Sequence, residues 1–92
     1  MYKNRSNDQL KIEKDIIERQ RIIQEYQSTG YLDRNNAIEK IRELRLTDTE
    51  VAGEANIRVA TNPVPFSQAS DQSLITELQI QISILSTKLL RL

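Results

Sequence analysis

The residue types that could do chemistry in this chain are carboxylates and cations, because the sequence contains no Cys and no His. This excludes thiolate nucleophiles, Ser–His and Cys–His pairs, and the usual structural zinc sites. Carboxylate pairs remain, such as Glu39 and Glu43 one helical turn apart, but no calcium-binding loop and no Gly-rich loop accompanies them. We therefore predict no catalytic, cofactor-binding or metal-binding residue, no cofactor, no small-molecule substrate, and a protein that is not an enzyme.

The composition favours association with another protein. The chain has 92 residues, which allows one small domain, and its aromatic content is no Trp, one Phe and three Tyr. A core this thin, with no disulfide or metal to hold it, favours oligomerisation or docking on a partner. The 13 basic and 13 acidic residues give a net charge of zero, so we do not expect nucleic acid as a partner.

The start of the chain, Met1 to Arg5, leads into no apolar run, which argues against a secretory signal. No segment approaches the roughly 20 apolar residues that a membrane span needs. We expect a cytoplasmic or particle-associated protein with no signal peptide, no transmembrane segment and no membrane partner.

The strongest pattern lies in residues 71–92, which we predict to form one helix that begins near Ser70. Ile and Leu recur there at alternating spacings of 3 and 4, an uninterrupted a/d heptad series that favours knobs-into-holes packing. Two further residues, Ile80 and Ile84, point to the opposite side and form a second contact face, which favours assembly with another chain. Packing of the stripe inside a three-helix monomer stays open as the alternative. The stripe consists of Ile75, Leu78, Ile82, Leu85, Leu89 and Leu92.

The N-terminal half predicts a helical hairpin. A first helix over residues 8–28 ends at Gly30, and a second begins at Asp33 or Asn36 and runs to about Leu46. The short link between them favours an antiparallel pair. One face of the first helix carries Ile12, Ile16, Ile23 and Tyr26, with Arg19 in the seventh-residue gap, and a narrower second face carries Leu10 and Ile17.

The segment between the hairpin and the last helix predicts a connector. A capping box at residues 47–50 starts a short helix, and alternation over residues 57–61 indicates an extended segment. Pro63 and Pro65 favour an extended chain through Phe66. Val64 and Phe66 could therefore serve as a docking hook for a partner, because a rigid segment loses little entropy on binding. The alternative is that one residue of this linker tucks onto the core.

Residues 46–57 resemble the first helix and turn of helix-turn-helix repressors, with Ala52, Asn56 and Ile57 at the positions of the Ala, the turn residue and the apolar residue. The resemblance implies DNA binding. It ends where the recognition helix would lie, because Asn62 replaces an apolar residue and prolines follow it. The segment is also acidic, which does not suit phosphate contacts.

The predicted fold class is all-α: a helical hairpin over residues 1–46, a short helix and extended Pro-containing connector over 47–70, and an amphipathic coiled-coil-forming heptad helix over 71–92. The predicted function is a structural or assembly subunit, or an adaptor, that oligomerises or docks in a larger complex through helical packing, such as a virion or other multi-copy particle. Its partners would be a homo-oligomer of itself, another protein, or both. The alternative is a small DNA-binding regulator with a degenerate helix-turn-helix and a C-terminal dimerisation helix.

Overall fold

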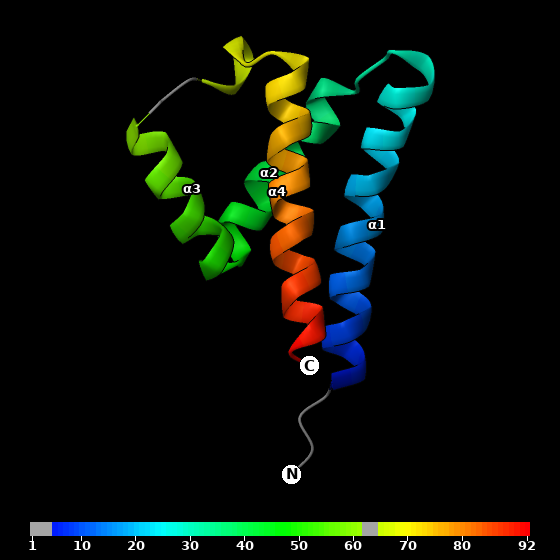
Figure 1. Ribbon diagram of the computed structural model, residues 1–92, viewed down its shortest axis with the longest axis vertical. Coiled ribbons are helices and arrows are strands. Elements are labelled where there is room, and N and C mark those ends of the chain that lie inside the picture. Colours follow the sequence, from blue (N-terminus) through cyan, green and yellow to red (C-terminus); the bar gives the residue numbers. More distant parts are fainter. Residues whose placement is uncertain (1–4, 62–64) are drawn as a thin grey trace.

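The fold is all-α, as predicted, in a computed structural model that describes the backbone of residues 5–61 and 65–92 and the side chains of residues 7–57 and 65–92. Figure 1 shows the order of the elements along the chain. The helices are α1 (Arg5–Thr29), α2 (Arg34–Thr47), α3 (Thr49–Thr61), the short 3₁₀ turn η1 (Phe66–Gln68) and α4 (Asp71–Leu90).

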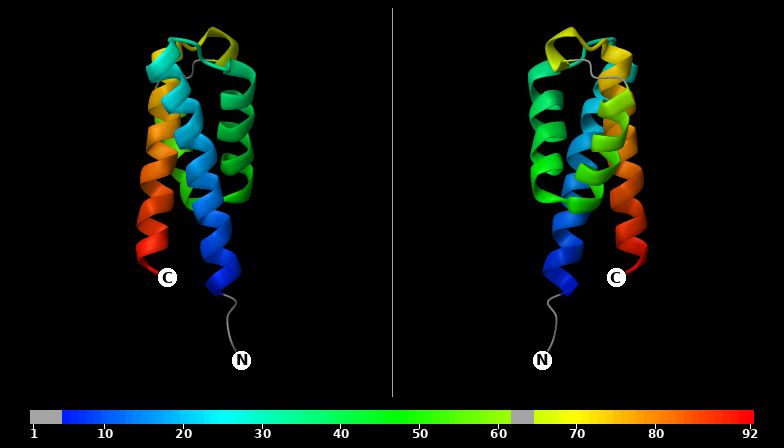
Figure 2. Two further views of the ribbon diagram at one scale, coloured as in Figure 1. Left: turned by 90° about the vertical axis from the view of Figure 1, so that its right-hand side faces the viewer. Right: turned by 90° about the vertical axis from the view of Figure 1, so that its left-hand side faces the viewer.

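The last helix holds the fold together. It runs antiparallel to α1, packs mainly against α1 and next against α2, and the views agree that these three helices lie side by side (Figures 1 and 2). The first two helices are antiparallel, as the predicted hairpin requires, but they contact each other much less than each contacts α4. The remaining helix, α3, lies across α2 and α4 on the side away from α1 (Figure 2).

A glycine and two polar side chains set three of the helix ends. Gly30 takes a φ of 76°, and its N–H donates to the Tyr26 carbonyl at 2.9 Å, which closes α1 in the left-handed conformation that glycine favours. The Asp33 carboxylate accepts from the Asn36 N–H at 3.1 Å, so Asp33 rather than Asn36 is the cap of α2. The Ser70 hydroxyl accepts from the Ser73 N–H at 3.1 Å and caps α4.

The prediction that residues 57–61 are extended is wrong, because these residues continue α3. The helix forms because the Asp48 carboxylate accepts from the Glu50 and Val51 N–H groups, and because Val51 and Ala55 bury one face of it. A hydrophobic alternation of this length fits an exposed helix end as well as a strand, and Ile57 is 72% exposed. The turn that the helix-turn-helix resemblance places at Asn56 is likewise wrong, since α3 passes through it.

The apolar core consists of two clusters stacked along the helices. The larger one joins α1, α2 and α4, and the smaller one joins the α2–α3 corner to α4. Side chains of α1 reach both clusters, since Ile12 and Ile16 pack partly buried against the smaller one. The larger cluster contains Ile22, Ile23, Leu32, Ala37, Ile41, Leu74, Ile75 and Leu78, and the smaller one Leu44, Val51 and Leu85.

A polar layer separates the two clusters. Arg19 is 1% exposed and Gln81 0% exposed, and the Arg19 Nε donates to the Gln81 Oε1 at 2.9 Å. The guanidinium also donates to the carbonyls of Asp15 at 2.8 Å and Lys40 at 2.7 Å, and the Gln81 amide donates to the Ile41 carbonyl at 3.0 Å. Burial lowers the pKa of Arg19, and nearby carboxylates, the Asp15 side chain first, oppose that shift. The layer satisfies its buried polar groups in only one register of α1, α2 and α4.

A second polar contact ties α4 to the α2–α3 corner. Besides capping α3, the buried Asp48 carboxylate accepts from the Lys88 Nζ at 2.7 Å. Burial by itself would raise the pKa of Asp48, but the hydrogen bonds from Lys88, Val51 and Glu50 outweigh it and leave the pKa below its usual value. A lowered pKa in the folded state stabilises the fold above the unfolded pKa near ~4, and this stabilisation is lost as the pH falls through the folded pKa.

We expect Asp48→Asn to lower the stability at pH 7 by about 1 kcal/mol, because asparagine keeps a cap oxygen but loses the charge that Lys88 pairs with. The loss should shrink as the pH is lowered below the ordinary carboxyl pKa of about 4, since the wild-type carboxylate then takes up its proton. Urea unfolding of both chains from acid to neutral pH measures this difference. The matched control is Asp33→Asn, at the exposed cap of α2. A deficit for Asp48→Asn that does not change with pH would contradict the role given to the ion pair.

Candidate docking surfaces

The predicted heptad stripe lies mostly inside the chain's own core. Ile75, Leu78 and Leu85 are buried against α1 and α2, and the other members, Ile82, Leu89 and Leu92, are half-buried. The buried residues of α4 are Leu74, Ile75, Leu78, Gln81 and Leu85, so the buried side is shifted from the predicted stripe toward Leu74 and Gln81. Burial of this side corresponds to the alternative of a three-helix monomer core, because pairing with another chain through the same residues would require the core to open.

The predicted second contact face is half-buried too. Ile84 packs against the cluster of Leu44, Val51 and Leu85, so it joins α4 to the α2–α3 corner. Ile80, one turn earlier on the same side of α4, is also half-buried. Ile84 therefore helps α3 to pack on α4, and the partial burial of both residues leaves little area for a further partner.

The structure describes only one of the two residues of the predicted docking hook. Val64 lies outside the described residues. Phe66 packs partly buried against the larger core cluster, which is the alternative weighed for this linker. Its ring lies under two guanidinium groups, with Arg42 at 5.2 Å and Arg45 at 4.8 Å from the ring centroid. Phe66 therefore serves as an internal anchor for the chain segment that precedes α4.

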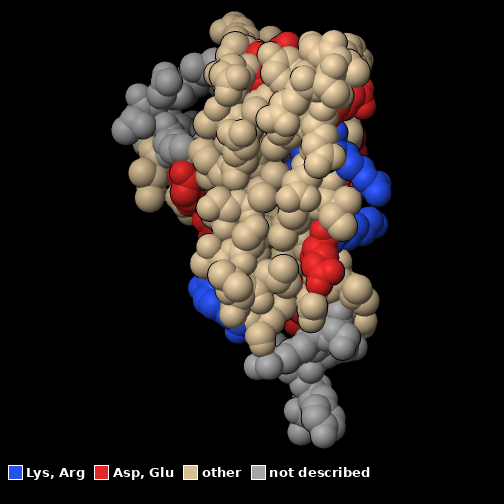
Figure 3. All heavy atoms as spheres, turned by 45° about the vertical axis from the view of Figure 1, so that its right-hand side comes forward, with Lys and Arg blue, Asp and Glu red and all other residues tan. Residues whose placement is uncertain are grey.

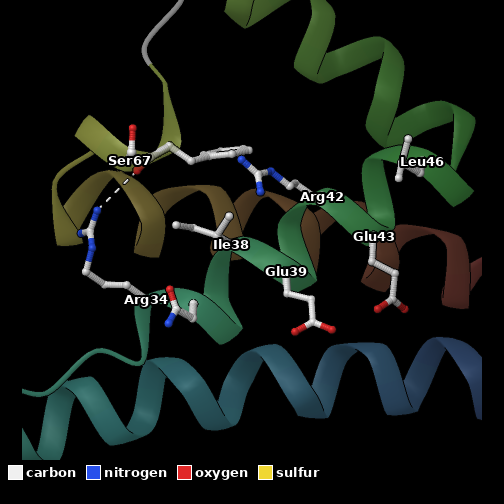
Figure 4. Close-up of a pocket in the computed structure, with 9 residues that line it drawn as sticks. Arg34, Ile38, Glu39, Arg42, Glu43, Leu46 and Ser67 are labelled. Atoms are coloured by element: carbon white, nitrogen blue, oxygen red, sulfur yellow. Dashed lines mark hydrogen bonds between the residues drawn. The ribbon is translucent and has the colours of Figure 1, made fainter.

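An open groove of about 700 Å³ lies beside Phe66 along α2, and Figure 4 shows the residues that line it. Arg34 is engaged within the chain, because it donates to the Asp71 carboxylate at 2.7 Å and to the Ala69 carbonyl at 2.7 Å. Arg42 covers the Phe66 ring, and Glu39 and Glu43 point the other way in Figure 4. With two cations and two carboxylates in its lining, the groove has no net charge that would select a ligand.

The charged residues of α4 and its C-terminal cap all point toward α2 and α3, where each has a partner. These residues are Asp71, Glu77, Lys88 and Arg91. Asp71 pairs with Arg34 at 2.7 Å and Glu77 pairs with Arg45 at 2.7 Å. Lys88 pairs with Asp48 at 2.7 Å and Arg91 pairs with Glu50 at 2.9 Å. The opposite side of α4 therefore carries no charge at all.

Charged residues are also segregated to one side of α1. Its α2-facing side carries Glu18, which pairs with Lys40 at 2.6 Å. The hydrogen bond from Lys40 lowers the pKa of Glu18, and the same bond raises the pKa of Lys40. On the other side of the helix, past the contact with α4, the exposed residues are mainly glutamines with Leu10 and Ile17 among them.

These two sides form one continuous surface, which we call the uncharged face. It appears in Figure 3 as a broad area nearly free of charged atoms over α1 and α4. Among the described residues Glu13 is its single charged side chain, and the Glu13 Oε1 accepts from the Gln9 Nε2 at 2.8 Å. Its exposed members are Leu10, Ile17, Gln20, Gln24 and Gln27 of α1 and Gln72, Thr76, Gln79, Ser83, Ser86 and Leu90 of α4.

Sequence reasoning found only part of this face. Leu10 and Ile17 were visible as a narrow second face of α1, and the structure leaves them 63% and 44% exposed. The Ser, Thr and Gln residues of α4 gave no hydrophobic signal, although their helical positions leave one side of α4 without a charge. A search for helix sides without charged residues would have found the face.

Neither the helices nor the ionisable groups of the described part of the chain indicate another kind of site. No helix in residues 5–61 and 65–92 has the length and apolarity needed to cross a membrane. Within the same residues, no three carboxylates gather closely enough to hold a metal ion. No protein-family model, no curated protein and no solved structure matches this chain.

Proposed function

We propose that this chain is a non-enzymatic assembly or adaptor subunit that binds another protein through the uncharged face. The observation that supports the proposal is the segregation of charge on α4, whose charged side chains all face α2 and α3. Interface cores differ from other protein surfaces mainly by their depletion of charged residues, rather than by a larger apolar fraction. An isolated subunit that needed only solubility would gain from charges on this side as well.

The size of the face agrees with a specific interface. The 20 residues of α4 extend over about 30 Å, and two packed helices present a surface about 20 Å wide. Their product is of the order of 600 Å², close to the ~800 Å² that each partner buries in a typical stable complex. Leu10, Ile17 and Leu90 supply apolar side chains to it, with Leu90 88% exposed.

Site-specific photocrosslinking in the source organism tests the proposal. A benzophenone side chain at Gln79 or Gln24, both exposed on the uncharged face, should give protein adducts, whereas one at the exposed Glu39 of α2 should not. The variant Ser83→Arg should abolish the adducts from Gln79 without changing the circular dichroism of the chain. Its matched control, Ser67→Arg, lies in the exposed η1 turn. Absence of adducts from the face, or equal adducts from Glu39, would refute the proposal.

A further inference from the structure

We infer that the partner on the uncharged face is a second copy of this chain, paired about a two-fold axis that runs parallel to α1 and α4. The inference rests on the proposed function, because it names the occupant of the same face. Three features of the described residues support it: the chemistry of the glutamines, the lack of charge, and the position of the exposed leucines.

The side chains of the face are complementary to themselves. A glutamine amide carries two donor hydrogens and an acceptor oxygen, so one glutamine can bond to another in either direction. Gln20 and Gln24 on α1 and Gln79 on α4 are exposed on this face. Ser83 and Ser86 are small, which allows a facing helix to approach closely. A strongly charged partner would lose the hydration of its charges against this face without gaining an opposite charge.

Symmetry makes the lack of charge decisive. In a two-fold pair the same patch of both subunits meets itself, so charges of one sign gathered near the axis oppose their own copies. The uncharged face largely avoids this conflict, since its one acid, Glu13, which accepts from Gln9 in the same helix, would face the uncharged side of α4 in the other copy rather than the other Glu13. The bordering cations of α1, such as Arg21, lie beyond Ile17 at the edge of the face.

The exposed leucines fix the direction of the axis. The buried Arg19–Gln81 bond sets the register of the antiparallel helices α1 and α4. Leu10 precedes Arg19 by nine residues and Leu90 follows Gln81 by nine, so both lie about 14 Å from the polar layer, at the same end of the molecule. An axis parallel to the helices brings the leucines of both copies together at that end. An axis across the helices would place them at opposite ends of the pair.

The resulting pair sets α1 of each copy against α4 of the other. Because α1 and α4 run in opposite directions, each helix of the pair then has only antiparallel neighbours. This is the up-and-down arrangement of a four-helix bundle, in which neighbouring helices pack nearly along one another. The core of each subunit stays closed, so each fold is complete before the copies associate.

Sedimentation equilibrium of the purified full chain tests the pairing. We expect a monomer–dimer equilibrium, and we expect Ser83→Arg to raise the dissociation constant at least about tenfold because the symmetry places the charge in the interface twice. Ser67→Arg should leave the dissociation constant unchanged. A monodisperse wild-type monomer at up to about 0.3 mM would overturn the inference. A dimer that Ser83→Arg does not weaken would overturn it as well.

Chemical crosslinking tests the direction of the two-fold axis. The chain has no Cys, so single variants Leu10→Cys and Leu90→Cys can be mixed and treated with a short bismaleimide. The parallel axis predicts a covalent dimer that contains one chain of each kind. A sedimenting dimer without this product would overturn the geometry. Suppose that the purified chain is a monomer but its Gln79 photocrosslinking variant still forms adducts with a different protein. This result would refute the second-copy inference and would still support the proposed function. If the purified chain is a monomer and the Gln79 variant forms no adducts with any protein, both the second-copy inference and the proposed function are refuted.

Discussion

Replacing Gln81 by leucine is expected to destabilise the chain by about 2–3 kcal/mol, although leucine is more apolar than glutamine. Gln81 is fully buried, and its Oε1 accepts from the Arg19 Nε at 2.9 Å. Leucine in its place leaves a charged N–H group of Arg19 without this acceptor in a site that water does not reach. A buried donor that loses its acceptor costs more than the added apolar contact returns.

The double replacement gives the sharper result. Arg19→Met alone should also destabilise the chain, because it leaves the Gln81 oxygen unpaired. The double variant Arg19→Met, Gln81→Leu should lose clearly less free energy of unfolding than the sum of the losses of the two single variants. The carbonyls that Arg19 and Gln81 contact keep the hydrogen bonds of their own helices. Apolar residues of similar volume commonly replace a buried polar network at little cost once both partners change together.

Urea unfolding followed by circular dichroism measures the four chains of this cycle, and the coupling energy is expected to be about 2 kcal/mol. The control is Gln68→Leu, an exposed glutamine of η1 that lies outside the uncharged face, which should change the stability by less than about 0.5 kcal/mol. Additive single and double variants would show that Arg19 and Gln81 do not act as one buried layer.

The same pair shows what the sequence could and could not predict about the core. Arg19 could be recognised from the sequence as an interruption in the apolar stripe of α1, but its partner could not. Gln81 lies 62 residues further along the chain, and a glutamine between Ile80 and Ile82 looks like a solvent-facing residue. Only the packing of α4 between α1 and α2 makes Gln81 a core position. Local patterns do not contain that contact.

Helix ends were more predictable than helix faces. Gly30, the cap at Asp33 and the cap at Ser70 are local signals, and they agree with the observed ends of α1, α2 and α4. The prediction for residues 57–61 was wrong because a short alternation of branched apolar residues does not distinguish a strand from the end of a helix. The position of Phe66 depends on two arginines of α2 that no local rule connects to it.

The candidate site was predictable in part for a different reason. Exposed apolar residues such as Leu10 and Ile17 can be read from the sequence as a second side of α1. The absence of charge on α4 is also visible in the sequence, but its meaning depends on which side of the helix is buried. The predicted second face fell on Ile80 and Ile84 because these are the apolar residues behind the stripe, whereas the uncharged side of α4 carries Ser, Thr and Gln residues that give no apolar signal.

A series of Leu→Ala substitutions along α4 measures directly which side of the helix is buried. We expect Leu74→Ala to cost about 3–4 kcal/mol, because Leu74 is fully buried in the larger cluster although the heptad stripe omits it. Leu89→Ala removes a member of the stripe that is only half-buried, and it should cost about 1 kcal/mol. Leu90→Ala removes a side chain that is 88% exposed and should have almost no effect on the stability of the monomer.

The three variants remove the same atoms from one helix, so differences between them report burial rather than chemistry. Their free energies of unfolding are best compared at low micromolar concentration, where pairing of two copies through Leu90 contributes little. A larger loss at Leu89 than at Leu74 would mean that the heptad stripe, which includes Leu89 and omits Leu74, faces the core in place of the side that carries Leu74 and Gln81. That rotation of α4 would also turn Ser83 and Gln79 away from the surface beside α1. The order Leu74, Leu89, Leu90 therefore tests the core and the uncharged face together, because the burial of one side of α4 determines which side is left for a partner.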